Sequence, residues 1–99
     1  MIVEVADFQI DPAQHEAFKT AIAHGLDSVL SGSPGYMGHQ VLAGIESPGR
    51  FVLLVRWKTL EDHTVGFRES PLFPNWLAIV GPFFASPPKV EHFVVSDQV

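Results

Sequence analysis

The sequence predicts an α+β domain of the ferredoxin-like type, in which helices cover one face of an antiparallel sheet. Strand-like and helical segments follow one another in the order β-α-β-β-α-β, and no linker separates them. A length of 99 residues fits a single domain over residues 1–99, on the usual scale of about 100–200 residues. With 46 % hydrophobic and 17 % charged residues, the chain can fill a core, which excludes a disordered protein.

The first half of the chain predicts a strand, a helix and a turn. Residues 2–10 are rich in β-branched and aromatic side chains, which favours a strand. Asp11 is placed to cap a helix that begins at Pro12, and Gln14 would complete a capping box. The helix has an apolar stripe at helical spacing and ends before the turn-forming residues 31–35. The stripe consists of Phe18, Ile22, Leu26, Val29 and Leu30.

The second half predicts a β-hairpin, a broken helix and a last strand. Thr59 is expected to cap the helical segment after the hairpin, with Asp62 three residues on, and Pro71 interrupts that segment. The expected strands are 36–45, 50–57 and 90–95, and the expected helical segments are 60–67 and 72–80.

One face of the predicted sheet has too many apolar residues to be left in water. Strand 50–57 is apolar at five successive positions, 51–55, and residues 93–95 repeat this on the last strand. Helices cover only one face of such a sheet, so the other would be a large exposed apolar patch. We therefore expect a homodimer in which two such faces pack together. The alternative is that the loop with Phe83 and Phe84 folds over this face.

Charge and cysteine usage exclude several classes of protein. Eleven acidic and six basic residues give a formal charge of −5, which argues against nucleic-acid binding. No apolar run approaches the ~20 residues of a membrane span, and the N-terminus has no signal-peptide pattern, so we expect a cytoplasmic protein. Without cysteine there is no disulfide, thiolate nucleophile or cysteine-based metal site.

Several short motifs, taken in order, resemble those of a known family. They are Pro34-Gly35-Tyr36, the strand 50–57 ending in Trp57, Leu60-Glu61-Asp62-His63, and the segment 67–73, in which Ser70 precedes Phe73 by three residues. This pattern resembles the antibiotic biosynthesis monooxygenase family of dimeric α/β barrels. The resemblance implies a homodimer with one pocket per subunit between sheet and helices. Some members oxygenate aromatic polyketides without metal or flavin, and others degrade haem or transform or cleave small metabolites.

Positions within the motifs distinguish branches of that family. The haem-degrading relatives use an Asn on the first strand, a Trp three residues before the helix Ser and a His seven after it. Here the first strand has no Asn, and the other positions are Phe67 and Leu77, so no haem ligand is expected. In polyketide-oxidising members a Tyr lies six residues past the strand Trp and an Asn four before it. Those positions are His63 and Leu53.

His63 is the candidate catalytic residue. An imidazole titrates near neutral pH, which suits proton transfer to or from a phenolic substrate. The resemblance places it at the edge of the pocket, in the position of the Tyr. The alternative is a structural histidine that is hydrogen-bonded to the backbone or to Asp62.

Four further residues are candidates for substrate binding. Trp57 and Trp76 are suited to stack on a planar substrate, and Phe67 lies one turn after His63. Arg68 is suited to hold an anionic or quinone oxygen. The alternatives are core packing for the aromatic residues and a solvated helix position for Arg68. A metal site of His39, His63 and His92 is a weaker hypothesis, since no two histidines have ligand spacing along a helix or strand.

The sequence thus predicts a cofactor-independent monooxygenase-like enzyme that acts on a small aromatic or quinone-forming metabolite. No metal or other cofactor is expected. The alternative is a non-catalytic dimeric barrel that binds a small hydrophobic ligand.

Overall fold

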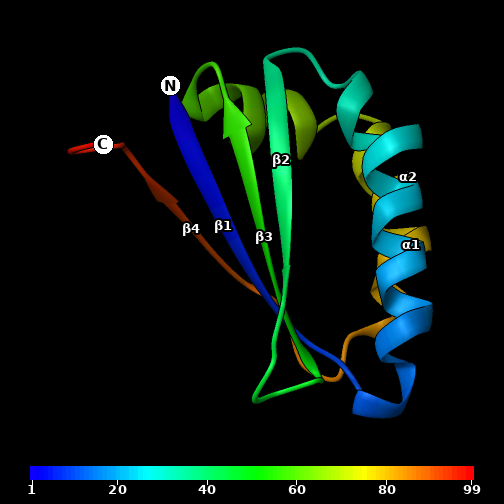
Figure 1. Ribbon diagram of the computed structural model, residues 1–99. Helices are drawn as coiled ribbons and strands as arrows, with labels where there is room; N and C mark the ends of the chain where they lie inside the picture. Colours follow the sequence, from blue (N-terminus) through cyan, green and yellow to red (C-terminus); the bar gives the residue numbers. More distant parts are fainter.

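The computed structural model describes residues 1–99 and has the expected α+β architecture (Figure 1). The strands are β1 (Ile2–Gln9), β2 (Tyr36–Ala43), β3 (Arg50–Trp57) and β4 (Lys89–Phe93), and the α-helices are α1 (His15–Ser28) and α2 (Leu72–Val80). The antiparallel sheet has the order β2-β3-β1-β4, and both helices lie on the same face of it. The predicted ferredoxin-like fold class is confirmed. No helix has the length and apolar character needed to cross a membrane.

The two predicted helix starts differ in how they are capped. The Asp11 carboxylate accepts a hydrogen bond from the backbone N–H of Ala13 at 2.9 Å, as a cap should. The expected capping box is wrong, because Gln14 makes no side-chain cap bond and the chain first forms a short 3₁₀ turn. At the second start the box does form: Thr59 Oγ1 accepts from the Asp62 N–H, and Asp62 Oδ2 accepts from the Thr59 N–H.

The segment after this second cap is a π-helix, η3 (Asp62–Phe67), where an ordinary helical segment was expected. Its wider turn is closed by a hydrogen bond from the Arg68 N–H to the His63 carbonyl, 3.1 Å long. His63 and Phe67 are both buried in it, at 3 % and 2 % exposure. The π turn therefore brings both side chains to the face that meets the sheet.

The core lies between the helices and the alternate side chains of the two central strands. In β3, Phe51, Leu53, Val55 and Trp57 are at most 1 % exposed, and the residues between them are half-buried. In α1 the predicted stripe meets this row: Phe18, Ile22 and Leu26 are also at most 1 % exposed. Sheet and helices thus bury one continuous apolar layer.

The opposite side of the sheet, here called the open face, has no helix on it (Figure 1) and carries several apolar side chains among charged ones. By register its apolar members are Val3, Val5, Leu42, Val52, Leu54 and Phe93. Leu42 is 47 % exposed and Phe93 50 %. The alternative of a covering loop is wrong: Phe84 stacks on Phe8 and Phe83 packs on Phe18, both on the helix side. The chain itself leaves the open face in contact with solvent.

Gly35 is needed where the chain enters β2. Its φ of 86° lies in the left-handed region, and a Cβ there would collide with the Asp62 side chain that caps η3. We expect Gly35→Ala to cost about 1–2 kcal/mol from the backbone alone, and hence to lower the thermal midpoint by ~4 °C or more. The control is Gly32→Ala, where nothing lies within 4 Å of an added Cβ. Equal midpoints for the two variants, measured by circular dichroism, would contradict this prediction.

Candidate functional site

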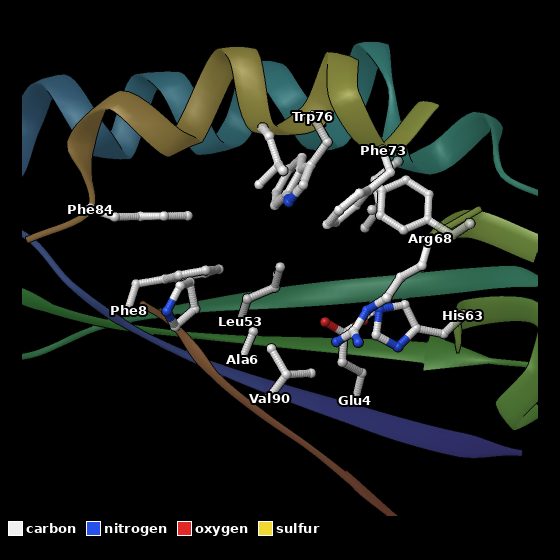
Figure 2. Close-up of a pocket in the computed structure, with 14 residues that line it drawn as sticks. Glu4, Ala6, Phe8, Leu53, His63, Arg68, Phe73, Trp76, Phe84 and Val90 are labelled. Carbon is white, nitrogen blue, oxygen red and sulfur yellow. Dashed lines mark ion pairs between the residues drawn. The ribbon is translucent and has the colours of Figure 1, made fainter. Parts of the chain in front are cut away.

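A cavity of about 280 Å³ lies between the sheet and the helices. Of the 14 residues that line it, 10 are hydrophobic, which suits a small apolar or aromatic molecule. Figure 2 shows Glu4, His63 and Arg68 together at one end and Phe8 and Phe84 at the other. The remaining apolar lining includes Leu53, Phe73, Trp76 and Val90. The cavity is therefore apolar along most of its length and ionisable at one end.

Glu4 is a carboxyl group in the core-facing row of β1. Because side chains alternate along a strand, it points the same way as Ala6 and Phe8, and only 6 % of it is exposed. The indole N–H of Trp57 donates to its Oε1 at 2.9 Å. Burial raises the pKa of Glu4, and the Trp57 hydrogen bond and the positive charge of Arg68 oppose that rise.

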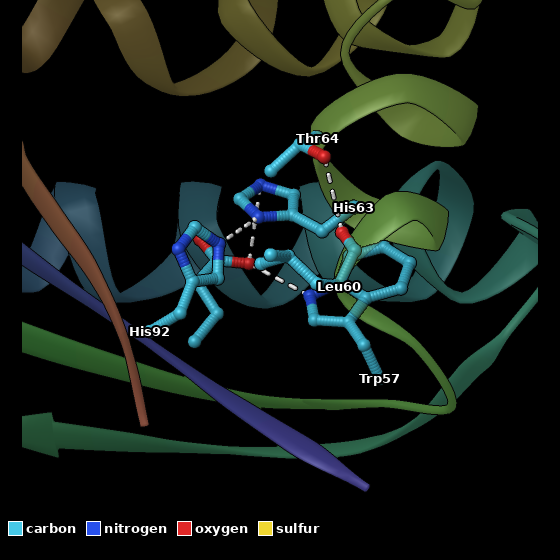
Figure 3. Close-up of polar contacts among 6 residues, drawn as sticks. Trp57, Leu60, His63, Thr64 and His92 are labelled. Atoms are coloured by element: carbon cyan, nitrogen blue, oxygen red, sulfur yellow. Dashed lines mark hydrogen bonds and ion pairs between the residues drawn. The ribbon is translucent and has the colours of Figure 1, made fainter. Parts of the chain in front are cut away.

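His63 lies between a carboxyl group and a second imidazole (Figure 3). Its Nε2 is 3.4 Å from Glu4 Oε1, and its Nδ1 is 2.7 Å from Nε2 of His92. The His63 ring also stacks on Trp57, with centroids 5.2 Å apart and an interplanar angle of 16°. Burial, followed by the charges of Arg68 and His92, lowers the pKa of His63 to about 4. His63 is therefore neutral at pH 7.

His92 joins this cluster from β4. It is the register partner of Glu4 across the β1–β4 pair, so its side chain faces the helices, and it is half-buried. Burial and the charge of Arg68 lower its pKa as well. Both imidazoles are thus neutral at pH 7, and in their shared hydrogen bond one nitrogen donates and the other accepts.

Arg68 brings a positive charge to the same end of the cavity. It follows η3 directly and lines the cavity. No carboxylate oxygen lies within 4.0 Å of its guanidinium, and the guanidinium makes no hydrogen bond within the protein. Its donors are therefore available to an anionic oxygen of a bound molecule.

The family profile named Antibiotic biosynthesis monooxygenase matches residues 1–78. The chain belongs to this family. The uncharacterized protein YczJ of Bacillus subtilis is 37 % identical to it over 93 residues, which cover 94 % of this chain and 97 % of that protein. A crystal structure from Bordetella bronchiseptica that carries the family name is 33 % identical and has a TM-score of 0.86. It covers 99 % of this chain and 96 % of that chain.

More distant relatives share the fold. SnoaB of Streptomyces nogalater, a cofactor-independent oxygenase, is 15 % identical to this chain and has a TM-score of 0.73. The match covers 99 % of this chain and 95 % of SnoaB. The antibiotic biosynthesis monooxygenase fold is therefore retained where little of the sequence is.

In this antibiotic biosynthesis monooxygenase family member, four of the five predicted site residues line one cavity: His63, Phe67, Arg68 and Trp76. Trp57 does not line this cavity, so the structure gives its predicted contact with substrate no support. It is fully buried, and its indole donates a hydrogen bond to Glu4 and stacks on the ring of His63. The roles of the other four stay predictions.

Sequence reasoning missed the part that Glu4 and His92 play in the cluster. The sequence signal for Glu4 was its position in the strand. Residues two apart in a strand point to the same face, so Glu4 must face the core together with Ala6 and Phe8. His92 was considered only as a metal ligand, together with His39 and His63. The structure places the His39 ring against the Tyr36 hydroxyl, and no group of three or more His, Asp or Glu side chains is arranged to hold a metal ion.

The lowered pKa of His63 predicts a pH-dependent stability. Between pH 6.5 and about 4 the unfolded chain binds a proton that the folded chain does not. The free energy of unfolding therefore falls as the pH falls through this window, by up to about 3 kcal/mol from this group. Glu4 acts in the opposite direction, because its raised pKa favours proton uptake by the folded chain.

Urea unfolding from pH 7 to pH 4.5 measures the effect. His63→Gln is expected to lose less stability over this range than the wild type does. His24→Gln, which removes an exposed histidine of α1, is the matched control and is expected to follow the wild type. Parallel curves for wild type and His63→Gln would contradict the prediction.

Proposed function

We propose that this protein is a cofactor-independent monooxygenase-like enzyme that oxidises a small aromatic or quinone-forming metabolite. The observation that carries this proposal is the composition of the cavity: an apolar chamber of about 280 Å³ with Glu4, His63 and Arg68 at one end. Such a chamber fits an aromatic ring that carries an oxygen substituent. Membership of the family and the shared fold with SnoaB, a cofactor-independent oxygenase, support the same chemistry.

The proposed reaction needs no electron donor besides the substrate. A ring CH₂ group that is activated by neighbouring phenol rings reacts with one O₂ to give a ring carbonyl and one water. Loss of a proton makes the ring system an electron-rich anion, which reduces O₂ and forms a carbon–oxygen bond. The O–O bond then breaks, and the second oxygen leaves as water with one proton taken back from solvent and the remaining hydrogen of that carbon. The substrate is oxidised by four electrons and O₂ is reduced by four.

The side chains divide this work between them. Phe67 and Trp76 hold the aromatic ring and keep water from it. The guanidinium of Arg68 stabilises the anionic oxygen that forms. His63 moves the released proton, and its contact with half-buried His92 leads from the cavity toward the surface. No metal ion, haem or flavin enters these steps.

We further propose that the enzyme is a homodimer in the cytoplasm. The support for the dimer is the open face, whose apolar side chains the chain itself leaves uncovered. A second copy offers a matching apolar surface, since a twofold interface brings the same patch together from both chains. Burial of these side chains would remove a large patch from water.

An oxygen-consumption assay tests the catalytic proposal. Chelator-treated protein is mixed with a panel of oxidisable phenols, such as dihydroxynaphthalenes and anthrone, and products are identified by mass spectrometry with ¹⁸O₂. We expect enzyme-dependent oxygen uptake and one ¹⁸O atom in the product, above the background with heat-denatured protein. If every phenol is inert but one binds tightly by calorimetry, the protein is the hydrophobic-ligand binder, as its largely apolar cavity lining also permits.

A further inference from the structure

We infer that the carboxyl group of Glu4 is the catalytic base that takes the proton from a hydroxyl of the bound aromatic, with His63 and His92 behind it as the exit path for that proton. This inference rests on the proposed function and assigns the first proton transfer to a different residue. It changes the part of His63 from first acceptor to carrier.

Both nitrogens of His63 are already occupied. Nδ1 shares a hydrogen bond with His92, and Nε2 faces Glu4 Oε1 at 3.4 Å. Each ring nitrogen is thus directed at a neighbouring side chain and not at a substrate in the cavity. The imidazole is well placed to pass a proton from one neighbour to the other.

Glu4 does have a free atom. Its Oε1 accepts from Trp57, whereas its Oε2 has no hydrogen-bond partner in the protein. Ser33 Oγ is the only fully buried side-chain nitrogen or oxygen that lacks a hydrogen-bond partner. Since Glu4 Oε2 also lacks a partner, it is not fully buried and retains accessible surface. Since Glu4 is 6 % exposed and lines the cavity, that surface opens on the cavity. Figure 2 shows the carboxyl group beside Arg68 and His63.

The charges around the cluster favour the carboxylate over the imidazole as proton acceptor. Glu4 comes from β1, His63 from η3, His92 from β4, and Arg68 from the residue after η3. Burial and the positive charge of Arg68 both disfavour an imidazolium here. Burial raises the proton affinity of Glu4, and Arg68 can then balance the phenolate instead of the carboxylate.

The proton transfers balance in two stages. In the first, Glu4 Oε2 accepts the hydroxyl proton, the O–H bond breaks, and its electron pair stays on the substrate oxygen as a phenolate. In the second, the protonated carboxyl group of Glu4 rotates so that its O–H faces His63 Nε2 and gives up its proton there, while Nδ1–H of His63 passes its proton to Nε2 of His92. His92 releases a proton from its Nδ1 to solvent. Glu4 is then ionised again, and both imidazoles are neutral.

Glu4→Gln tests the inference, because the amide oxygen can still accept from Trp57 but cannot take up a proton. The probe is 4-nitrophenol, whose absorption reports its ionisation, and infrared difference spectra report the carboxyl groups. We expect wild-type protein to bind the probe as phenolate and to gain a protonated-carboxyl band. Both signals should be lost in Glu4→Gln and kept in His63→Gln. The matched control is Glu16→Gln, which removes an exposed carboxylate of α1 and should keep both signals.

Turnover provides the second readout. With any phenol that the wild type oxidises, Glu4→Gln should lower kcat by about 10²–10⁴-fold. Its residual rate should rise with pH as the substrate ionises in solution. Unchanged kcat in Glu4→Gln, or a probe that binds as phenolate without Glu4, overturns the inference and leaves the proposed function standing. If no phenol is oxidised, the proposed function fails and the nitrophenol spectra still decide the role of Glu4.

A second substitution of Glu4 covers the case in which Glu4→Gln does not fold, as judged by circular dichroism. Glu4→Asp keeps the charge but draws the carboxyl back from the cavity by one methylene. It should keep the protonated-carboxyl band and lose at least tenfold in kcat. Wild-type kcat in Glu4→Asp would overturn the inference.

Discussion

Replacement of His63 by alanine is expected to lower kcat for an oxidisable phenol by about 10²–10⁴-fold while the fold stays intact. The physical reason is that His63 connects Glu4 to His92, at 3.4 and 2.7 Å, and no other side chain joins these two groups. Without it, the proton that the substrate releases stays inside an apolar cavity. Added imidazole, which fits the space left by the side chain, should restore part of the rate.

Trp76→Ala is the contrasting variant. Trp76 lines the cavity on α2 and is 6 % exposed, but its indole N–H does not titrate near neutral pH and cannot carry a proton from the substrate. Its loss should chiefly raise KM, because it removes a wall that binds ground state and transition state alike. Steady-state oxygen uptake separates the two effects. If His63→Ala turns over like the wild type, the cavity is the site but His63 is not the proton carrier.

Leu54→Asp is expected to convert the proposed homodimer into a folded monomer. Leu54 lies on β3 in the middle of the open face and is half-buried in the single chain. In a dimer its side chain would be enclosed, and an unpaired carboxylate there costs several kcal/mol. At about 1.4 kcal/mol per factor of ten, the dissociation constant should rise roughly 10³-fold.

Light scattering at micromolar concentration measures the change. Wild-type protein should have twice the chain mass of 10.9 kDa, and Leu54→Asp should have the chain mass. Ile45→Asp is the matched control, because it introduces the same charge at a residue that is already 89 % exposed in the turn before β3. A wild-type monomer would contradict the prediction, and so would a dimer that survives Leu54→Asp.

Most elements could be predicted because their signals are local. The Thr59 and Asp62 side chains cap each other across three residues, so the start of η3 is visible in the sequence itself. The type of helix was not visible. Six residues are too few for their apolar spacing to distinguish a π turn from an α turn, and packing against the sheet decides between them. β4 ends at Phe93, two residues before the predicted end, where its pairing with β1 stops at Val3.

Part of the candidate site could also be predicted. His63, Phe67, Arg68 and Trp76 occur within 14 residues of one another, and all reach the cavity from one side. The position of Trp57 beside the cavity lining could not be predicted, because an aromatic residue at a strand end has the same local pattern whether it lines a cavity or packs beneath one. Its complete burial follows from the layer of helices that covers β3.

The sequence by itself determined the order of strands and helices and which side chains of each element face the core. It also indicated that one sheet face with several apolar side chains has no helix on it. These features depend on residue type and on the spacing of residues a few positions apart. Such local patterns do not require contacts between distant parts of the chain. Only the tertiary structure decided which polar groups meet in the core. Glu4 and Trp57 are 53 positions apart, and His63 and His92 are 29 apart. Strand register brings such residues together, and a shift by one position would turn Glu4 toward the open face.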